Sequence, residues 1–138
     1  MYIDDRTRLI TSYGIFKNAT TDNTLALLKG GIAEFGKPKA VMTDHGSQYY
    51  ANYPNANQNN TEFRKYLNIL GIKHYLARVN RPQTNGKAER FFLTYKTEYA
   101  TGTFSNLKDF IIHYNEKRLH MSLYYKTPKE VWNELIVR

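Results

Sequence analysis

The sequence predicts a single α/β or α+β domain in which helices flank a small sheet, and three observations predict it. The 138 residues suffice for one hydrophobic core but not for two full domains. Short runs rich in β-branched and aromatic residues alternate with longer segments of helical periodicity. Neither an internal repeat nor a Pro- or Gly-rich linker divides the chain, and this order of elements is typical of a layered sheet-and-helix fold.

Three short strands are predicted. Residues 8–16 are rich in β-branched and aromatic side chains, Ala40–Thr43 is a short buried-type run, and residues 72–77 form another. Residues 52–60 hold five asparagines and predict a solvated loop. A second polar loop is expected over residues 78–86.

Five helices are predicted from apolar positions three or four residues apart and from signals at their ends. They are expected from Thr21 or Asp22 to about Phe35, from Thr61 to Leu70, from the 78–86 loop to about Ala100, from near Ser105, and from Thr127. Gly30 and Gly31 lie inside the first of them and each costs about 1 kcal/mol relative to alanine, which favours a break in that helix. The last opens with Thr127-Pro128-Lys129-Glu130, a capping box with proline at the first helical position.

The charge balance points toward a polyanionic partner. Lysine and arginine number 20 against 12 aspartate and glutamate, which gives a net charge of +8 and a pI near 9.6. The lack of cysteine excludes a disulfide scaffold and thiolate metal sites and is compatible with the cytoplasm. No apolar stretch is long enough to span a bilayer, and the first residues do not form a secretory signal. The composition therefore indicates a cytoplasmic chain that faces nucleic acid and no membrane.

Asp44 is the first residue suited to chemistry. It follows the Ala40–Thr43 strand and precedes a turn that contains Gly46, so its carboxylate is expected to project from the rim of the sheet. A metal ion needs such an approachable oxygen. A turn aspartate that caps its own backbone is the commoner structural alternative.

Glu89 is the second such residue. Asn85, Glu89, Lys96 and either Phe92 or Leu93 fall near one stripe of the helix after the second loop. A stripe that mixes carboxylate, amide and ammonium groups is unusual for a core face but ordinary for a solvated one, so a purely solvated face remains the alternative.

Together, the two carboxylates have the donor chemistry for one or two Mg²⁺ ions. Such ions activate water or a DNA 3′-hydroxyl and stabilise the leaving oxygen of an in-line phosphoryl transfer. Lys96, about two turns after Glu89, would contact the phosphate of a bound strand, and the positive surplus would add affinity that does not depend on sequence. A site of this kind needs a third carboxylate.

Several segments resemble the integrase catalytic core and, more narrowly, DDE-type transposases of bacterial insertion sequences of the IS3 kind and retroviral integrases. They are Thr43-Asp44-His45-Gly46-Ser47-Gln48-Tyr49, Leu70-Gly71-Ile72-Lys73-His74 and Pro82-Gln83-Thr84-Asn85-Gly86-Lys87-Ala88-Glu89-Arg90-Phe91-Phe92. The segment from Tyr114 to Pro128 is similar to the family's closing pattern YN-x-x-R-x-H-x-x-L-x-x-x-TP. Each motif is weak alone, but the ordered set covers nearly the whole chain.

The resemblance implies a ribonuclease-H-like mixed sheet flanked by helices, and DNA cleavage and strand transfer that use Mg²⁺ or Mn²⁺. Asp44 and Glu89 take the places of the family's second and third catalytic carboxylates, which bind the metal. Lys96 takes the place of a DNA-contacting lysine, and a homo-oligomer is expected. The other predicted DNA contacts are Asn85, Lys87 and Arg90.

The chain departs from the family pattern in two places. The 44 residues between Asp44 and Glu89 exceed the family spacing of about 35, and the asparagine-rich segment 52–60 accounts for the excess as a surface insertion of low cost. The family's first aspartate lies on a central first strand, upstream of the hairpin that Asp4 and Asp5 occupy. Residues 1–138 are therefore expected to be a single catalytic core domain that is incomplete at its N-terminus, with a gap, a re-pairing or a borrowed edge in its sheet.

The remaining polar candidates are expected to be structural. The four histidines are not spaced as a metal cluster, and hydrogen-bonded or solvated roles are expected for them. Asn115, Arg118 and His120 match signature positions of the family that are structural or close to DNA. Phe91 and Phe92 are expected to belong to the core.

Three functions are compatible with these residues. The leading interpretation is the core of a metal-dependent transposase or integrase that, as this fragment, is inactive or impaired. The second is a transposase remnant without catalysis that binds DNA or pairs with another subunit. The third is a related nuclease that hydrolyses DNA but never joins ends.

Overall fold

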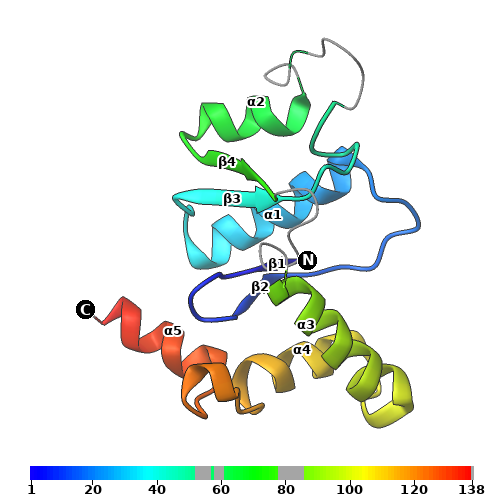
Figure 1. Ribbon diagram of the computed structural model, residues 1–138, viewed down its shortest axis with the longest axis vertical. Helices are drawn as coiled ribbons and strands as arrows, with labels where there is room; N and C mark the ends of the chain where they lie inside the picture. The colour runs from blue at the N-terminus through cyan, green and yellow to red at the C-terminus, as the bar shows by residue number, and fades with distance from the viewer. Residues whose placement is uncertain (52–56, 58–60, 78–85, 138) are drawn as a thin grey trace. The chain divides into compact units, whose positions relative to one another are not determined.

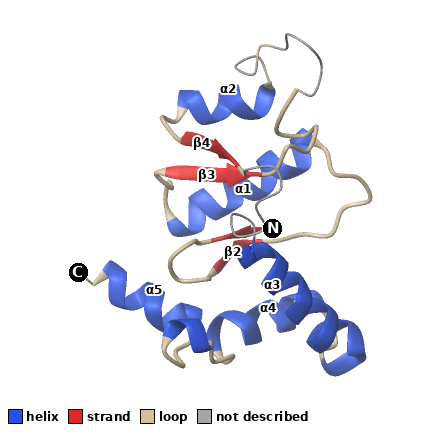
Figure 2. Ribbon diagram, viewed as in Figure 1, coloured by secondary structure: helices blue, strands red, loops and turns tan. Residues whose placement is uncertain are grey.

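The computed structural model describes residues 1–51, 57, 61–77 and 86–137 (Figure 1). Helices predominate among them, and the strands are few and short (Figure 2). The chain divides into two compact units. The first comprises Met1–Tyr2 and Ser12–Asn85, and the second comprises Ile3–Thr11 and Gly86–Arg138.

A parallel pair of strands organises the first unit. β3 (Ala40–Thr43) pairs in parallel with β4 (Lys73–Leu76), and the connection between them contains α2 (Glu62–Ile69). Parallel strands require such a crossover, and they end at the same edge of their sheet. Asp44, the residue after β3, therefore lies at the carboxyl edge of the pair.

The helices of this unit begin and end where local signals place them. α1 (Thr21–Phe35) is capped by the Thr20 side chain, which accepts the Asn23 N–H at 3.2 Å, and it ends at Gly36 with a φ of 88°. α2 is capped in the same way by Thr61. The helix expected over residues 21–35 is thus confirmed, and its two internal glycines do not break it.

The core of the first unit lies between these helices and β3–β4. Its buried side chains are Leu28, Val41, Phe63, Leu67 and Ile72, with several tyrosines packed at their margin. Tyr2 is one of them, and its hydroxyl lies 2.9 Å from the Thr24 hydroxyl. Burial raises the pKa of Tyr2, so this phenol stays neutral.

A second strand pair is formed by β1 (Tyr2–Ile3) and β2 (Ile10–Ser12). The Asp4 carboxylate closes the connection, because it accepts the backbone N–H and the hydroxyl of Thr7, both at 2.8 Å. The strand expected over residues 8–16 is confirmed only at its centre. Residues 13–16 have no strand partner, and Ile15 is exposed.

The described strands thus form two separate two-stranded sheets, β1–β2 and β3–β4. A sheet with a gap is expected to divide in this way. None of the helices in the described ranges is long and apolar enough to cross a bilayer.

The second unit is mainly helical. Its elements are α3 (Gly86–Thr94), the π-helical segment η3 (Tyr95–Thr103), α4 (Leu107–Glu116), the 3₁₀ turn η4 (Met121–Leu123) and α5 (Pro128–Ile136). An aromatic cluster centred on the fully buried Phe110 packs α3, η3 and α4 together. Phe91 belongs to this cluster, but Phe92 is half exposed, so the expectation of a buried Phe92 is wrong.

The single helix expected up to about Ala100 changes type at Tyr95. Threonine hydroxyls recur through this region, and Thr97 and Thr101 each donate to the carbonyl four residues earlier at 3.0 Å. Such bonds compete with the regular backbone pattern. Gly102, with a φ of 83°, then ends the segment.

The last two helices start as predicted. The Asn106 side chain accepts the Asp109 N–H at 2.9 Å at the start of α4. At the start of α5, Thr127 and Glu130 exchange side chain–backbone hydrogen bonds of 3.2 and 2.7 Å. The capping box that the sequence predicts is therefore confirmed.

Candidate functional site

Asp44 is exposed at the carboxyl edge of the β3–β4 pair. Its Oδ1 accepts the Gly46 N–H at 2.9 Å, which is the self-capping turn that the sequence allowed. In the described part of the chain, neither Oδ1 nor Oδ2 forms an ion pair. The turn fixes one oxygen of the carboxylate and leaves the other for a ligand, so the two interpretations of Asp44 are compatible.

A short hydrogen-bond chain holds the strand end that carries Asp44. The Thr43 hydroxyl donates to the Asp44 carbonyl at 2.9 Å and lies 2.8 Å from His74 Nε2. Because the hydroxyl has one proton to donate, both bonds form together when His74 Nε2 is the donor of the second. Sequence reasoning missed this link, since Thr43 and His74 lie 31 residues apart.

His74 is neutral in this position. Burial, with the nearby Arg64 guanidinium as a second cause, lowers the pKa of its imidazole to about 4. The ring packs edge-on against Phe63, with centroids 5.3 Å apart. Its Nδ1 is buried without a hydrogen-bond partner in the described residues. The expectation of a hydrogen-bonded structural histidine is confirmed here.

Glu89 lies in the first turn of α3, where a carboxylate interacts favourably with the helix dipole. The stripe that contains it is exposed throughout its described members, Glu89, Phe92, Leu93 and Lys96. The described members of this stripe therefore form a solvated face of α3 and η3. Asn85, the remaining member, lies outside the described residues.

The predicted DNA-contacting cations differ in their surroundings. Arg90 and Lys96 are exposed. Lys87 forms an ion pair with the Asp5 carboxylate and also donates to the Asp5 carbonyl at 2.8 Å. Lys87 is therefore already neutralised within its own unit.

The carboxylates near the N-terminus already have partners within the chain. Asp4 is engaged by Thr7, and Asp5 by Lys87. Among the residues that the structure describes, no group of three or more histidine, aspartate or glutamate side chains is placed to hold a metal ion. Asp44 belongs to the first unit and Glu89 to the second, and each offers the oxygen donors that Mg²⁺ prefers.

The signature residues near the end of the chain make structural contacts. Asn115 accepts the Ile10 N–H at 2.9 Å and donates to the Ile10 carbonyl at 3.0 Å. Arg118 pairs with Glu98 at 3.0 Å, and His120 packs edge-on against the Tyr114 ring. Of the two roles expected for these residues, the structural one accounts for the contacts.

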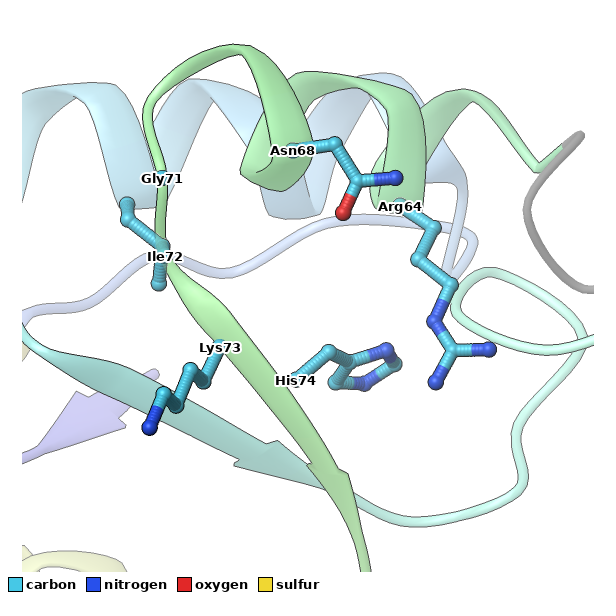
Figure 3. A pocket seen from close by; sticks show the side chains of 6 residues that line it. All are labelled: Arg64, Asn68, Gly71, Ile72, Lys73 and His74. Atoms are coloured by element: carbon cyan, nitrogen blue, oxygen red, sulfur yellow. The ribbon is translucent and has the colours of Figure 1, made fainter.

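A polar cavity of about 370 Å³ lies beside β4 in the first unit (Figure 3). Its lining consists of Arg64, Asn68, Gly71, Ile72, Lys73 and His74. Sequence reasoning singled out none of these for binding. The sequence feature that could have indicated the cavity is the spacing of Arg64 and Asn68, one helical turn apart and followed by a Lys-His pair.

The comparisons with known proteins agree on one family. The integrase core domain matches residues 1–82 and, in a second alignment, residues 70–128. The chain is 32% identical to the protein named putative integrase ORF3 of Spiroplasma virus SpV1-C74, over 97% of this chain and 41% of that protein. It is 33% identical to transposase InsD for insertion element IS2D of Escherichia coli (strain K12), over 67% of this chain and 31% of that protein. The chain thus spans less than half the length of these relatives.

Solved structures show the same fold. A chain in the cryo-EM structure of the simian T-cell lymphotropic virus intasome in complex with PP2A regulatory subunit B56 gamma matches 94% of this chain and 46% of its own length, with a TM-score of 0.73 and 20% identity. The HTLV-2 integrase catalytic core domain with magnesium, in its trimeric form, matches 94% of this chain and 80% of its own length, with a TM-score of 0.66 and 20% identity. The fold is therefore the ribonuclease-H-like fold of integrase catalytic cores, and the chain belongs to the integrase core domain family.

Proposed function

We propose that residues 1–138 form one catalytic core domain of an enzyme that cleaves DNA and joins its ends. The observation that carries the proposal is the exposed aspartate that follows the carboxyl end of a parallel strand. It occurs in a chain whose family match extends along both units. Ligands of α/β sheets bind at that edge.

Asp44 and Glu89 are the proposed ligands for Mg²⁺ or Mn²⁺. Both carboxylates are exposed and are free of ion pairs in the described ranges. A bound ion would activate water or a 3′-hydroxyl and stabilise the leaving oxygen of an in-line transfer. Gly46 and Thr43 orient Asp44 for this task, because one fixes its side chain and the other its carbonyl.

In our proposal, none of these 138 residues takes the place of the family's first catalytic aspartate. Asp4 and Asp5 are the nearest candidates by sequence. Their carboxylates bind Thr7 and Lys87, which supports the view that neither replaces it. A chain with two of three metal ligands would be inactive or severely impaired.

DNA is the proposed substrate and partner. Arg90 and Lys96 are exposed and supply charge for phosphate contacts, whereas Lys87 contributes less because Asp5 neutralises it. One similar structure is described as an intasome and two others as dimeric and trimeric forms, which supports a homo-oligomer that acts on DNA.

Calorimetric titration of the 138-residue chain with Mn²⁺ tests the metal site. Asp44→Asn and Glu89→Gln are each expected to weaken Mn²⁺ binding about tenfold, because each removes a charged oxygen ligand. Asp22→Asn removes the same charge from an exposed position on α1 and serves as the control. Unchanged binding in both test variants would refute the proposed ligands.

A strand-transfer assay with Mg²⁺ or Mn²⁺ then tests the missing aspartate. Little or no turnover is expected from the chain alone. Robust turnover that Asp44→Asn abolishes would show that a third ligand is present after all. Hydrolysis without joined products would indicate the related nuclease.

A remnant that binds DNA without catalysis is the second candidate. It is favoured by the exposed Arg90 and Lys96, which can contact phosphates without a metal ion. Salt-dependent DNA binding that is unchanged by Asp44→Asn and Glu89→Gln, together with no Mn²⁺ binding, would identify it.

A further inference from the structure

The cavity beside β4 is rich in hydrogen-bond donors. Figure 3 shows the Arg64 guanidinium beside the His74 ring, with the Asn68 amide on the same side. Arg64 and Asn68 come from successive turns of α2, and the other lining residues come from the start of β4 and the turn before it. Two secondary-structure elements therefore present polar groups to one space.

The cavity has a positive charge without a counterion. None of its six lining residues is acidic, and Arg64 and Lys73 form no ion pair within the described ranges. The adjacent Lys65, by contrast, pairs with Glu62 at 2.8 Å. An arginine that is partly buried next to an imidazole and has no carboxylate partner is suited to an anionic ligand.

The outer edge of β4 adds a backbone donor. The N–H groups of Lys73 and Ala77 bond to carbonyls beside β3, at 3.2 and 2.8 Å. Because donor direction alternates along a strand, the N–H of His74 points away from β3. A guanidinium and an amide from α2 and the first residues of β4 thus border one cavity.

We propose that this cavity binds a phosphate group. The arginine fork matches two phosphate oxygens, and the Asn68 amide and the His74 N–H can serve the others. Asp44 does not line this cavity, although His74, which does, contacts the neighbouring Thr43.

Two sources can supply the phosphate, inorganic phosphate and the backbone of DNA. Both present oxygen acceptors to the Arg64 guanidinium and the Asn68 amide. The DNA source rests on the function proposed above, and the cavity itself does not.

The test is a titration of the ¹⁵N-labelled 138-residue chain with sodium phosphate, followed by NMR at the side-chain signals of Arg64 and Asn68. Saturable shifts are expected with phosphate and not with sodium chloride of equal ionic strength. Arg64→Gln is expected to weaken binding about tenfold, because it removes a charge-assisted pair of hydrogen bonds. Lys65→Gln, which removes the same charge one residue away, is expected to change affinity less than about twofold.

Several outcomes decide the proposal. No saturable phosphate shift, or equal losses in the two variants, would overturn it. Asn68→Asp places a carboxylate in the cavity and is expected to abolish binding even if Arg64→Gln fails to fold. Asp44→Asn is expected to leave phosphate binding unchanged. A result against the proposed metal site can therefore be told apart from a result against the phosphate site.

A short DNA duplex in place of phosphate identifies the source. If the backbone of DNA is the ligand, the same signals shift, and Arg64→Gln weakens binding of the duplex as it weakens binding of phosphate. Shifts with inorganic phosphate but none with the duplex would support the cavity as a site for free phosphate and refute the DNA source.

Discussion

Asn115 offers the sharpest test of how the second unit is held together. Its side chain forms a pair of hydrogen bonds with the N–H and the carbonyl of Ile10, at 2.9 and 3.0 Å. Ile10 is only 2% exposed and lies 105 residues earlier in the chain. This one side chain therefore satisfies both backbone groups of a buried strand residue.

The magnitude follows from those two groups. Asn115→Ala leaves a buried donor and a buried acceptor without partners, and each costs about 1–3 kcal/mol. Partial entry of water reduces the sum, so we expect a loss of about 2–4 kcal/mol in the free energy of unfolding. For a chain of this size the melting temperature would fall by about 10 °C.

Urea and thermal unfolding followed by circular dichroism would measure this loss. Asn133→Ala, an exposed position on α5, is the matched control and should remain within about 0.5 kcal/mol of the native chain. Asn115→Asp keeps the acceptor for the Ile10 N–H and loses the donor to its carbonyl, so it should lie between the two at neutral pH. A loss below about 0.5 kcal/mol for Asn115→Ala would refute the reasoning.

Three further predictions concern local energetics. The pKa of the His74 imidazole falls from 6.5 to about 4 on folding, so the unfolded chain binds this proton more tightly than the folded chain does. The free energy of unfolding is therefore highest above pH 6.5 and declines by about 1–2 kcal/mol as the pH falls toward 4, since the ring is partly exposed. His74→Gln should flatten this part of a profile of denaturation against pH. Tyr124 is 91% exposed at a φ of 55°, so Tyr124→Gly should raise the free energy of unfolding by about 0.5–1 kcal/mol whereas Tyr124→Ala should not, as urea titration would show. Thr127→Ala removes the side-chain cap of α5 and should cost about 1 kcal/mol in the same titration, while Thr127→Ser should restore most of it.

The helices could be predicted because their signals are local. The caps of α1 and α5 depend on hydrogen bonds between residues three apart, which a sequence shows directly. The strand expected over residues 8–16 failed for the opposite reason. A strand extends only as far as a partner accompanies it, and β1 offers just Tyr2–Ile3.

The candidate site was predictable to the same extent. The position of Asp44 after β3 follows from a strand pattern and a glycine turn, both read from neighbouring residues. The support that His74 gives through Thr43 was hidden, because it depends on the parallel register of β3 and β4. The sequence could not mark Arg64 as a binding residue either, because this interpretation depends on the lack of an acidic residue in the lining of its cavity in the described structure.

The signature near the end of the chain shows why a motif can identify a family without marking its chemistry. Asn115 satisfies Ile10, Arg118 pairs with Glu98, and His120 packs against Tyr114. Each contact joins segments that are distant in sequence or turns the chain after α4, and the described structure engages the side-chain polar groups of Asn115 and Arg118 in these contacts. A chain could therefore keep this signature, and with it the fold, after losing a catalytic carboxylate. Activity must be judged from the proposed metal ligands alone, which is why the Mn²⁺ titration and the unfolding of Asn115→Ala test independent properties of this protein.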